Sequence, residues 1–323
     1  MCPGDIPRRT AEDQCGGPSS QAARPPELAD QAVTKFLSRE ADCPSVFVVG
    51  GVAVDVIAAV SRSITSGGFT QATSTTQRIG GCAVNIACGL SDTDVPCVVV
   101  GCLGTDERAA WLLAELADRG LATHLRAVPG PTALSMILVD PYGERTIVGL
   151  TDDLIRHIDV TDIALRPEDV MVFPQWRPGL ANSLRQARAA GCRTVVGLRA
   201  LEDLNRPEAD LAIGSRSEIA DPALVVLQQH RFKAIVVTDG GDGSRAYLRD
   251  GSSLIQSAVP ARPVDATGAG DAYLAGLLHE WVNNAPLQRC MEVGAAWGAL
   301  ATESRTSSPP PWSQVIERLG ERP

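Results

Sequence analysis

From residue 45 onward, short apolar runs alternate with segments in which apolar residues recur every three or four positions. Apolar runs of about four to eight residues are typical of buried strands, and the longer period is typical of helices packed on one side. Because this alternation is typical of right-handed βαβ units, we expect an α/β fold with a mainly parallel sheet. The predicted strands are 46–49, 95–102, 170–173, 193–198, 210–213, 233–238, 244–249 and 253–257, and the predicted helices are 106–119, 179–190, 217–220, 222–229, 287–302 and 312–319.

Two polar, β-rich stretches interrupt the alternation. Residues 61–79 are rich in Thr, Ser, Gln and Gly, and residues 123–150 contain two strand-like segments, 133–139 and 145–148. Alternating polar and apolar positions are typical of strands with one face in solvent. We expect both stretches to leave the main sheet and together form a small second layer, or lid.

The first 44 residues differ in composition from the rest. Pro, Gly, Ser, Gln and charged residues dominate, which is typical of segments that cannot bury a core. We therefore expect a disordered N-terminal tail over residues 1–44, with one short helix at 27–39, and a single folded domain over residues 45–323.

Composition limits the function classes. The net charge of −9 and the pI near 5.0 are unfavourable for nucleic-acid binding, and no apolar run is long enough for a membrane span. The nine cysteines form no C-x-x-C pair, and the four histidines lack zinc-binding spacing. With no signal-peptide pattern at the N-terminus, these features favour a cytoplasmic protein with reduced thiols.

A glycine-rich segment, 264–278, runs directly into an apolar helical pattern. Gly268 and Gly270 precede Asp271 at the expected helix start, where unpaired backbone amides and the helix dipole attract anions. The segment predicts a phosphate-binding loop with Asp271 as a general base. The alternative is a simple turn in which Asp271 only caps the helix.

Two further glycine pairs are each followed by a polar side chain. Gly50-Gly51 precedes Asp55 within an apolar run that resumes at 52–57, and Gly80-Gly81 precedes Asn85 in a predicted helix. An unpaired buried carboxylate is costly, so Asp55 needs a partner, a ligand or water. The alternative is that this stretch leaves the sheet and Asp55 is solvated.

These three motifs, in this order over residues 45–320, resemble those of the ribokinase-like (PfkB) family of small-molecule kinases. The second motif includes the strand and loop 98–106 that follow Asn85. The resemblance implies a doubly wound α/β core with a small β lid, and phosphoryl transfer from ATP to a hydroxyl group. By this resemblance, Asp271 is the base and the amides of Gly268, Ala269 and Gly270 form the anion hole. It assigns the hydroxyl-bearing substrate to Asp55, Gly80, Gly81 and Asn85.

The resemblance also implies a nucleotide site. Thr238, Gly240 and Gly243 match the family's phosphate loop after a strand, although an ordinary strand-to-strand turn would show the same pattern. The family's Asn-x-x-Glu motif, tied to Mg²⁺ and phosphates, is Ser215-Arg216-Ser217-Glu218 here. We expect Glu218 to hold Mg²⁺ through water, since Mg²⁺ usually keeps several waters.

Potassium and a dimer are weaker implications of the resemblance. Asp265 and Thr267 match two positions of the family's monovalent-cation site, but Arg305-Thr306 replaces a frequent Gly-Ala. Lids in this family often pair between subunits, so a homodimer through the lid is implied by resemblance alone.

Three functions stay open. The first is an ATP-dependent kinase that phosphorylates a hydroxymethyl group of a small sugar. The second is a nucleoside kinase, which needs an aromatic platform for the base; the lid offers only Phe69 and Tyr142, although Trp176 follows a core strand. The third is a ligand-binding or regulatory protein that keeps the fold without full activity, motivated by Ser215 and Arg305.

Two further interpretations concern the cofactor and the lid. A dinucleotide-dependent dehydrogenase fits poorly, because no G-x-G-x-x-G motif follows the first strand. Arg145 in the lid is interpreted as a solvated surface charge, with contact to an acidic substrate group as the alternative.

Overall fold

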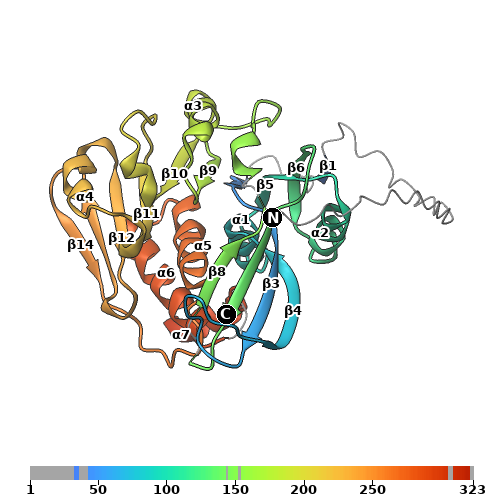
Figure 1. Cartoon of the computed structure of the whole chain (residues 1–323). Helices are drawn as coiled ribbons and strands as arrows, with labels where there is room; N and C mark the ends of the chain where they lie inside the picture. The colour runs from blue at the N-terminus through green and yellow to red at the C-terminus, as the bar shows by residue number, and fades with distance from the viewer. Residues whose placement is uncertain (1–32, 36–42, 143–144, 152–153, 305–307, 321–323) are drawn as a thin grey trace, which may run out of the picture.

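The computed structural model describes residues 33–35, 43–142, 145–151, 154–304 and 308–320. Within these ranges one large sheet carries most of the helices, and a smaller sheet projects from it (Figure 1). The strands of the large sheet are β1 (Val33–Lys35), β2 (Val46–Val49), β5 (Cys97–Leu103), β6 (Ala122–Ala127), β9 (Val170–Phe173), β10 (Arg193–Gly197), β11 (Leu211–Ser215), β12 (Ala234–Thr238), β13 (Ser244–Leu248) and β14 (Ser253–Gln256).

The strand order of the large sheet is β1-β6-β5-β2-β9-β10-β11-β12-β13-β14. All neighbours from β6 to β12 are parallel, while β1, β13 and β14 pair antiparallel at the two edges. The central strands are continuous apolar runs, because helices cover both faces of the sheet. The prediction of a mainly parallel α/β sheet is confirmed.

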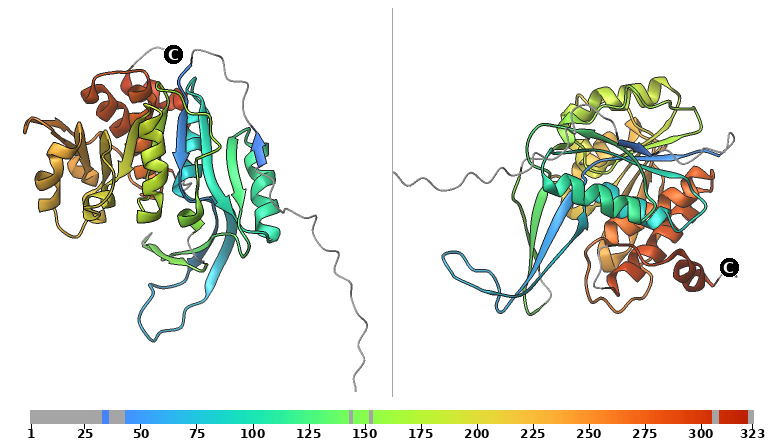
Figure 2. Two further views of the ribbon diagram at one scale, coloured as in Figure 1. Left: turned by 90° about the horizontal axis from the view of Figure 1, so that it is seen from above. Right: turned by 90° about the vertical axis from the view of Figure 1, so that its right-hand side faces the viewer.

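Helices pack on both faces of the large sheet (Figures 1 and 2). The first apolar core lies between the sheet and α1 (Cys82–Leu90), α2 (Glu107–Asp118), α5 (Ala269–Val282), α6 (Leu287–Thr302) and α7 (Trp312–Leu319). The second core lies under α3 (Ala181–Ala189) and α4 (Ala223–Gln228). The short 3₁₀ helices are η1 (Leu154–His157), η2 (Pro178–Leu180), η3 (Leu198–Glu202), η4 (Arg216–Glu218), η5 (Gln229–Arg231) and η6 (Gly240–Asp242). No helix in the described ranges is long and apolar enough to cross a membrane.

The smaller sheet is the lid, and its strand order is β4-β3-β7-β8. Its strands are β3 (Ala53–Val60), β4 (Ala72–Gly80), β7 (Leu134–Val139) and β8 (Arg145–Gly149). The boundaries differ from the prediction of 61–79 and 123–150. The resumed apolar run after Gly51 is lid strand β3, and the segment 122–127 is core strand β6, because its backbone pairs with β5 along its whole length.

Part of the predicted tail belongs to the main sheet. Val33–Lys35 forms β1 and pairs antiparallel with β6, so the predicted helix at 27–39 is wrong at these three residues. The unpaired edge of β6 supplies hydrogen-bonding partners that the local sequence does not reveal. The remainder of the predicted tail, apart from residues 43 and 44, lies outside the described residues.

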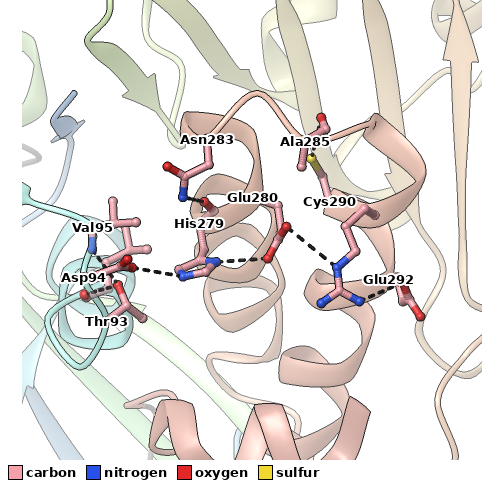
Figure 3. A network of polar contacts seen from close by, with 11 residues as sticks. Thr93, Asp94, Val95, His279, Glu280, Asn283, Ala285, Cys290 and Glu292 are labelled. Atoms are coloured by element: carbon pink, nitrogen blue, oxygen red, sulfur yellow. Dashed lines mark hydrogen bonds and ion pairs between the residues drawn. The ribbon is translucent and has the colours of Figure 1, made fainter. Parts of the chain in front are cut away.

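A network of polar contacts holds the C-terminal end of α5 (Figure 3). His279 lies 3.5 Å from Asp94 through Nε2 and 3.1 Å from Glu280 through Nδ1. Arg289 of α6 contacts Glu280 at 3.7 Å and Glu292 at 3.0 Å. These contacts join α5 to α6 and to the loop after α1, so the far end of α5 is fixed relative to the core.

Candidate active site

Asp271 lies in the first turn of α5, directly after the glycine-rich loop. The helix is preceded by Gly268, whose φ of 75° is in the left-handed region that favours glycine. Asn85 of α1 donates a hydrogen bond of 2.8 Å from Nδ2 to Asp271 Oδ2. Two motifs that are far apart in the sequence therefore meet at one carboxylate.

The surroundings of Asp271 shift its acid–base behaviour. The pKa of Asp271 is raised to about 7, chiefly by burial; the hydrogen bond from Asn85 opposes this shift, and the negative charges of Glu218 and Asp55 add to it. A carboxylate with a pKa near neutrality can accept a proton at physiological pH. A residue that acted only as a helix cap would not need this clustering of acids around it.

Asp271 opens onto a cavity of about 340 Å³. The cavity joins the first turn of α5 to the ends of β11 and β12, as expected for a site at the carboxyl ends of parallel strands. Its lining residues include four positions predicted to bind nucleotide or phosphate, namely Gly270, Ser215, Glu218 and Thr238. The proposed proton acceptor and the proposed phosphate-binding residues therefore share one cavity.

The first turn of α5 offers backbone amides for an anion. Within the described residues, the amides of Gly270 and Asp271 make no backbone hydrogen bond, whereas the Ala269 amide donates to Ala266 O at 3.3 Å. Of the three predicted amides, those of Gly268 and Gly270 stay available, and that of Asp271 adds a third. The unpaired amides suit an oxyanion, because the helix dipole favours negative charge there.

Asp55 lies in lid strand β3, opposite Arg78 of β4 in the antiparallel register. The stretch does leave the main sheet, as lid strand β3, but the Asp55 side chain is buried, so the alternative that Asp55 is solvated is wrong. Burial raises the pKa of Asp55, and the charge of Arg78 opposes this shift. The adjacent Gly80 is required for close packing, since a Cβ there would lie 2.1 Å from Asp55 Oδ2.

The backbone conformation of Gly81 determines where α1 begins. Its φ is 95°, and a Cβ at this position would lie 2.2 Å from Gly51 O. The two glycine pairs, 50–51 and 80–81, therefore pack against each other where α1 begins. This contact places Asn85 one turn into α1, within reach of Asp271.

Ser215 and Glu218 form a capping box. The Ser215 amide donates to Glu218 Oε1 at 2.8 Å, and the Ser215 hydroxyl accepts from the Ser217 amide at 3.4 Å. Burial raises the pKa of Glu218, although the Ser215 amide and the charge of Arg199 lower it. Ser215, at the family's asparagine position, thus holds the backbone that positions Glu218.

The donor chemistry of this corner suits Mg²⁺ carried by a nucleotide. Glu218 is a carboxylate that lines the cavity with one oxygen already oriented by the Ser215 amide. In the part of the chain that the structure describes, no group of three or more His, Cys, Asp or Glu could hold a metal ion alone. Mg²⁺ would therefore be held by nucleotide phosphates, water and Glu218, consistent with its preference for oxygen ligands and retained waters.

The predicted phosphate loop connects the antiparallel strands β12 and β13. Gly240 and Gly243 lie in the turn around η6, and the Asp239 amide donates to Gly243 O at 2.8 Å. Thr238 lines the cavity and donates from its hydroxyl to Gly214 O at 3.3 Å. The segment is therefore a strand-to-strand turn at Gly240 and Gly243, and it also brings Thr238 to the cavity.

Asp265 is paired with the lid. Arg145 of β8 forms an ion pair with Asp265, and both side chains are largely buried. The interpretation of Arg145 as a solvated surface charge is therefore wrong, because the loop before α5 comes close enough to bind it. Potassium binding stays a prediction: the Asp265 carboxylate pairs with Arg145, and Arg305 and Thr306 lie outside the described residues.

The aromatic residues offer little flat surface on which a nucleobase could stack. Phe69 and Tyr142 of the lid are 77% and 85% exposed. Trp176 borders the cavity, but its ring packs edge-on against Phe173 and its Nε1 donates to Asp203 at 3.0 Å. The ring of Trp176 is therefore mostly committed to the core.

The residues of this region that were not predicted from the sequence include three arginines and a cysteine. Arg177, Arg199 and Cys82 line the cavity, and Arg78 faces Asp55 from the neighbouring lid strand. The spacing of Arg78, two residues before Gly80, could have placed it near the glycine pair. Its register opposite Asp55 depends on strand pairing, which the local sequence does not encode.

The chain matches a known family and known structures. A family model described as pfkB family carbohydrate kinase matches residues 44–154 and 180–314. The ATP-dependent ribose-1-phosphate kinase of Halopiger xanaduensis is 28% identical over 292 residues, covering 86% of this chain and 98% of that protein.

Two solved structures share the fold. Ribokinase from Thermotoga maritima has a TM-score of 0.72 at 17% identity and covers 86% of this chain and 100% of its own. The Burkholderia thailandensis nucleoside kinase in complex with inosine has a TM-score of 0.71 at 19% identity, covering 86% and 98%. These TM-scores establish a common fold for the three proteins.

Proposed function

Because the chain belongs to the pfkB family of carbohydrate kinases, we propose that it transfers a phosphoryl group from ATP to a hydroxymethyl group of a small sugar or sugar derivative. One observation carries the proposal. The Asp271 carboxylate, with its pKa raised to about 7, shares a cavity with Gly270, Ser215, Glu218 and Thr238. A proton acceptor beside unpaired amides is the arrangement that phosphoryl transfer to a hydroxyl requires.

In the proposed reaction, Asp271 accepts the proton of the attacking hydroxyl. The carboxylate is oriented by Asn85, which leaves one Nδ2 hydrogen and Oδ1 for a substrate hydroxyl. Asp55, together with the backbone of Gly80 and Gly81, would bind further hydroxyl groups. Carboxylate and amide groups suit a polyol because they accept and donate in fixed directions.

The nucleotide would lie along the ends of β11 and β12. The amides of Gly268, Gly270 and Asp271 would bind the transferred phosphoryl group, and Thr238, Gly240 and Gly243 the remaining phosphates. Members of the family use ATP and typically Mg²⁺, which neutralises phosphate charge during transfer. Glu218 would hold that ion through water, and its Ser215 cap keeps the carboxylate oriented.

A sugar is favoured over a nucleoside as the acceptor. The relative from Halopiger xanaduensis, aligned over 98% of its length, is a ribose-1-phosphate kinase, and this similarity supports a sugar-derived acceptor. The exposed positions of Phe69 and Tyr142 leave no stacked platform from the lid. A nucleoside kinase is the second candidate, because Trp176 borders the cavity and a nucleoside kinase shares the fold.

The experiment is an acceptor screen with MgATP. Sugars, sugar derivatives and nucleosides are tested separately, ADP release is followed, and phosphorylated products are identified by ³¹P NMR. We expect turnover with a sugar-type acceptor that carries a free hydroxymethyl group. Turnover with nucleosides alone would favour the second candidate. Tight ligand binding without any turnover would favour a binding or regulatory protein and contradict the proposal.

A further inference from the structure

Two arginines of the lid carry guanidinium nitrogens that lack partners. The Nε atoms of Arg78 and Arg145 are buried, and neither makes a hydrogen bond. Arg78 makes no hydrogen bond or ion pair at all among the described residues, and Arg145 uses Nη2 for Asp265. A buried donor without a partner is costly, so these groups require an explanation.

Both arginines lie on the lid face that carries Asp55. Arg78 is the cross-strand partner of Asp55, so their side chains share a face. Arg145 pairs with Val139, which pairs with Ala59, four residues beyond Asp55 on β3. Because side chains alternate with a period of two, Arg145 is on that same face. This face turns toward the core, since Arg145 reaches Asp265 of the loop before α5.

The two guanidinium groups are close enough to repel each other. Burial lowers the pKa of Arg145, and the charge of Arg78 lowers it further. Each arginine has one acidic neighbour, but Asp55 does not form an ion pair with Arg78 within the described residues, and its carboxylate also influences Asp271. Two mutually repelling guanidinium groups, each with a buried Nε that makes no hydrogen bond, would be stabilised by an anion placed between them.

We propose that Arg78 and Arg145 bind an anionic group of the acceptor, either a phosphate monoester or a carboxylate. The inference rests on the proposed kinase function and specifies its acceptor. Asp55 faces Arg78 across the strand pair, and its charge also acts on Asp271. The anionic group therefore lies at the end of the acceptor remote from the hydroxymethyl group that reacts.

Guanidinium groups are suited to this role. Each presents donors in a planar fork that matches phosphate and carboxylate oxygens, and arginine stays charged when partly buried. If the arginines only balanced Asp55 and Asp265, neutral and anionic acceptors of equal shape would bind equally well. The difference between such acceptors is therefore the decisive measurement.

The first experiment compares acceptors in matched pairs, each with a free hydroxymethyl group. Ribose 1-phosphate is compared with methyl ribofuranoside, fructose 1-phosphate and fructose 6-phosphate with fructose, and gluconate with glucose, all at saturating MgATP. We expect kcat/KM to be at least about ten-fold higher for the anionic member of one pair, on the scale of one charge-assisted contact. The pairs with a phosphorylated sugar and the pair of gluconate with glucose show whether the site prefers a phosphate or a carboxylate.

The second experiment removes one guanidinium. Arg78→Met keeps the aliphatic stem and should lower kcat/KM for the preferred anionic acceptor roughly ten- to hundred-fold, with a clearly smaller loss for the neutral partner and no change in KM for ATP. Arg78→Lys, which retains the charge, should recover part of the loss. Arg62→Met is the matched control, because Arg62 lies in the exposed lid loop before β4; it should have no effect.

A binding measurement separates this inference from the kinase proposal. The Asp271→Asn protein is titrated calorimetrically with fructose 6-phosphate and with ribose 1-phosphate. We expect Kd to be higher in the double variant Asp271→Asn/Arg78→Met than in Asp271→Asn. Equal kcat/KM for neutral and anionic acceptors, or equal losses for both in Arg78→Met, would overturn the anion site while leaving the kinase proposal intact. Arginine-dependent binding with no turnover in the unmodified protein would sink the kinase proposal instead.

Discussion

Asn85 of α1 donates its side-chain hydrogen bond to Asp271 of α5 over 2.8 Å. This bond joins α1, which follows lid strand β4, to α5, which follows the glycine-rich loop. It orients the carboxylate and, by stabilising the charged form, holds down a pKa that burial raises. The contact therefore links the proposed acceptor side of the site to its proposed base.

Asp271→Asn should remove most activity while preserving nucleotide binding. A positioned base contributes roughly 10²–10⁴-fold to rate, and asparagine cannot accept the proton. Turnover is measured by ADP release and ATP affinity by calorimetry. A variant with an unchanged rate would rule out Asp271 as the base.

Activity should decline as the pH falls through about 7, because Asp271 must be ionised to accept a proton. Asn85→Ala removes a hydrogen bond that lowers this pKa, so the acidic limb of the kcat/KM profile should shift to higher pH. Asn283→Ala is the control, since Asn283 bonds to His279 O at the other end of α5. An acidic limb at the same pH in both variants would contradict this assignment.

The raised pKa of Asp271 also has a stability consequence. Between its usual pKa and about 7, Asp271 is protonated in the folded state and ionised in the unfolded state, so stability falls as pH rises through this window. Asp271→Asn removes this loss. We expect its Tm to exceed that of the unmodified protein at pH 8, with the difference shrinking toward pH 5. A constant difference across that range would contradict the shifted pKa.

Asp55→Ala should raise the apparent KM for the hydroxylated acceptor by about ten-fold or more, the scale of one hydrogen bond to a charged group. The KM for ATP should stay constant, because Asp55 lies in the lid and does not border the cavity beside Ser215 and Thr238. Initial rates with each substrate varied in turn provide the measurement. If only the KM for ATP changed, Asp55 would belong to the nucleotide site instead of the acceptor site.

Breaking the Arg145–Asp265 pair should destabilise the protein through the lid contact. Asp265→Asn leaves a largely buried guanidinium without its carboxylate, which costs up to about 3–5 kcal/mol in buried pairs. The double variant Arg145→Met/Asp265→Asn should be less destabilised than the sum of the two single variants. Urea denaturation of the four proteins tests this coupling, and additive effects would argue against it.

Some of this molecule was predictable because the relevant information is local. The βαβ alternation follows from apolar runs, and the helix start beside Asp271 follows from Gly268 and Gly270. Register and edge pairing are not local. The assignment of 122–127 to the core sheet, the strand at Val33–Lys35 and the placement of Arg78 opposite Asp55 all depend on which backbone lies alongside.

The ion pair of Arg145 failed as a prediction for the same reason. Its partner, Asp265, is 120 positions away in the chain, and the sequence around each residue gives no indication of the contact. Long-range contacts between a lid and a core loop appear only once both elements are placed. The interpretation of an isolated surface charge is the default when no partner is visible.

Both lid segments are insertions between core strands. β3 and β4 lie between β2 and α1, and β7 and β8 lie between β6 and β9, while the cavity beside Ser215 and Thr238 is lined, apart from Cys82, by the C-terminal half. Grafting 53–80 and 134–149 from a relative would therefore replace one recognition surface without altering the order of the core strands. A lineage carrying this architecture can diversify the molecules it recognises while its core is inherited unchanged.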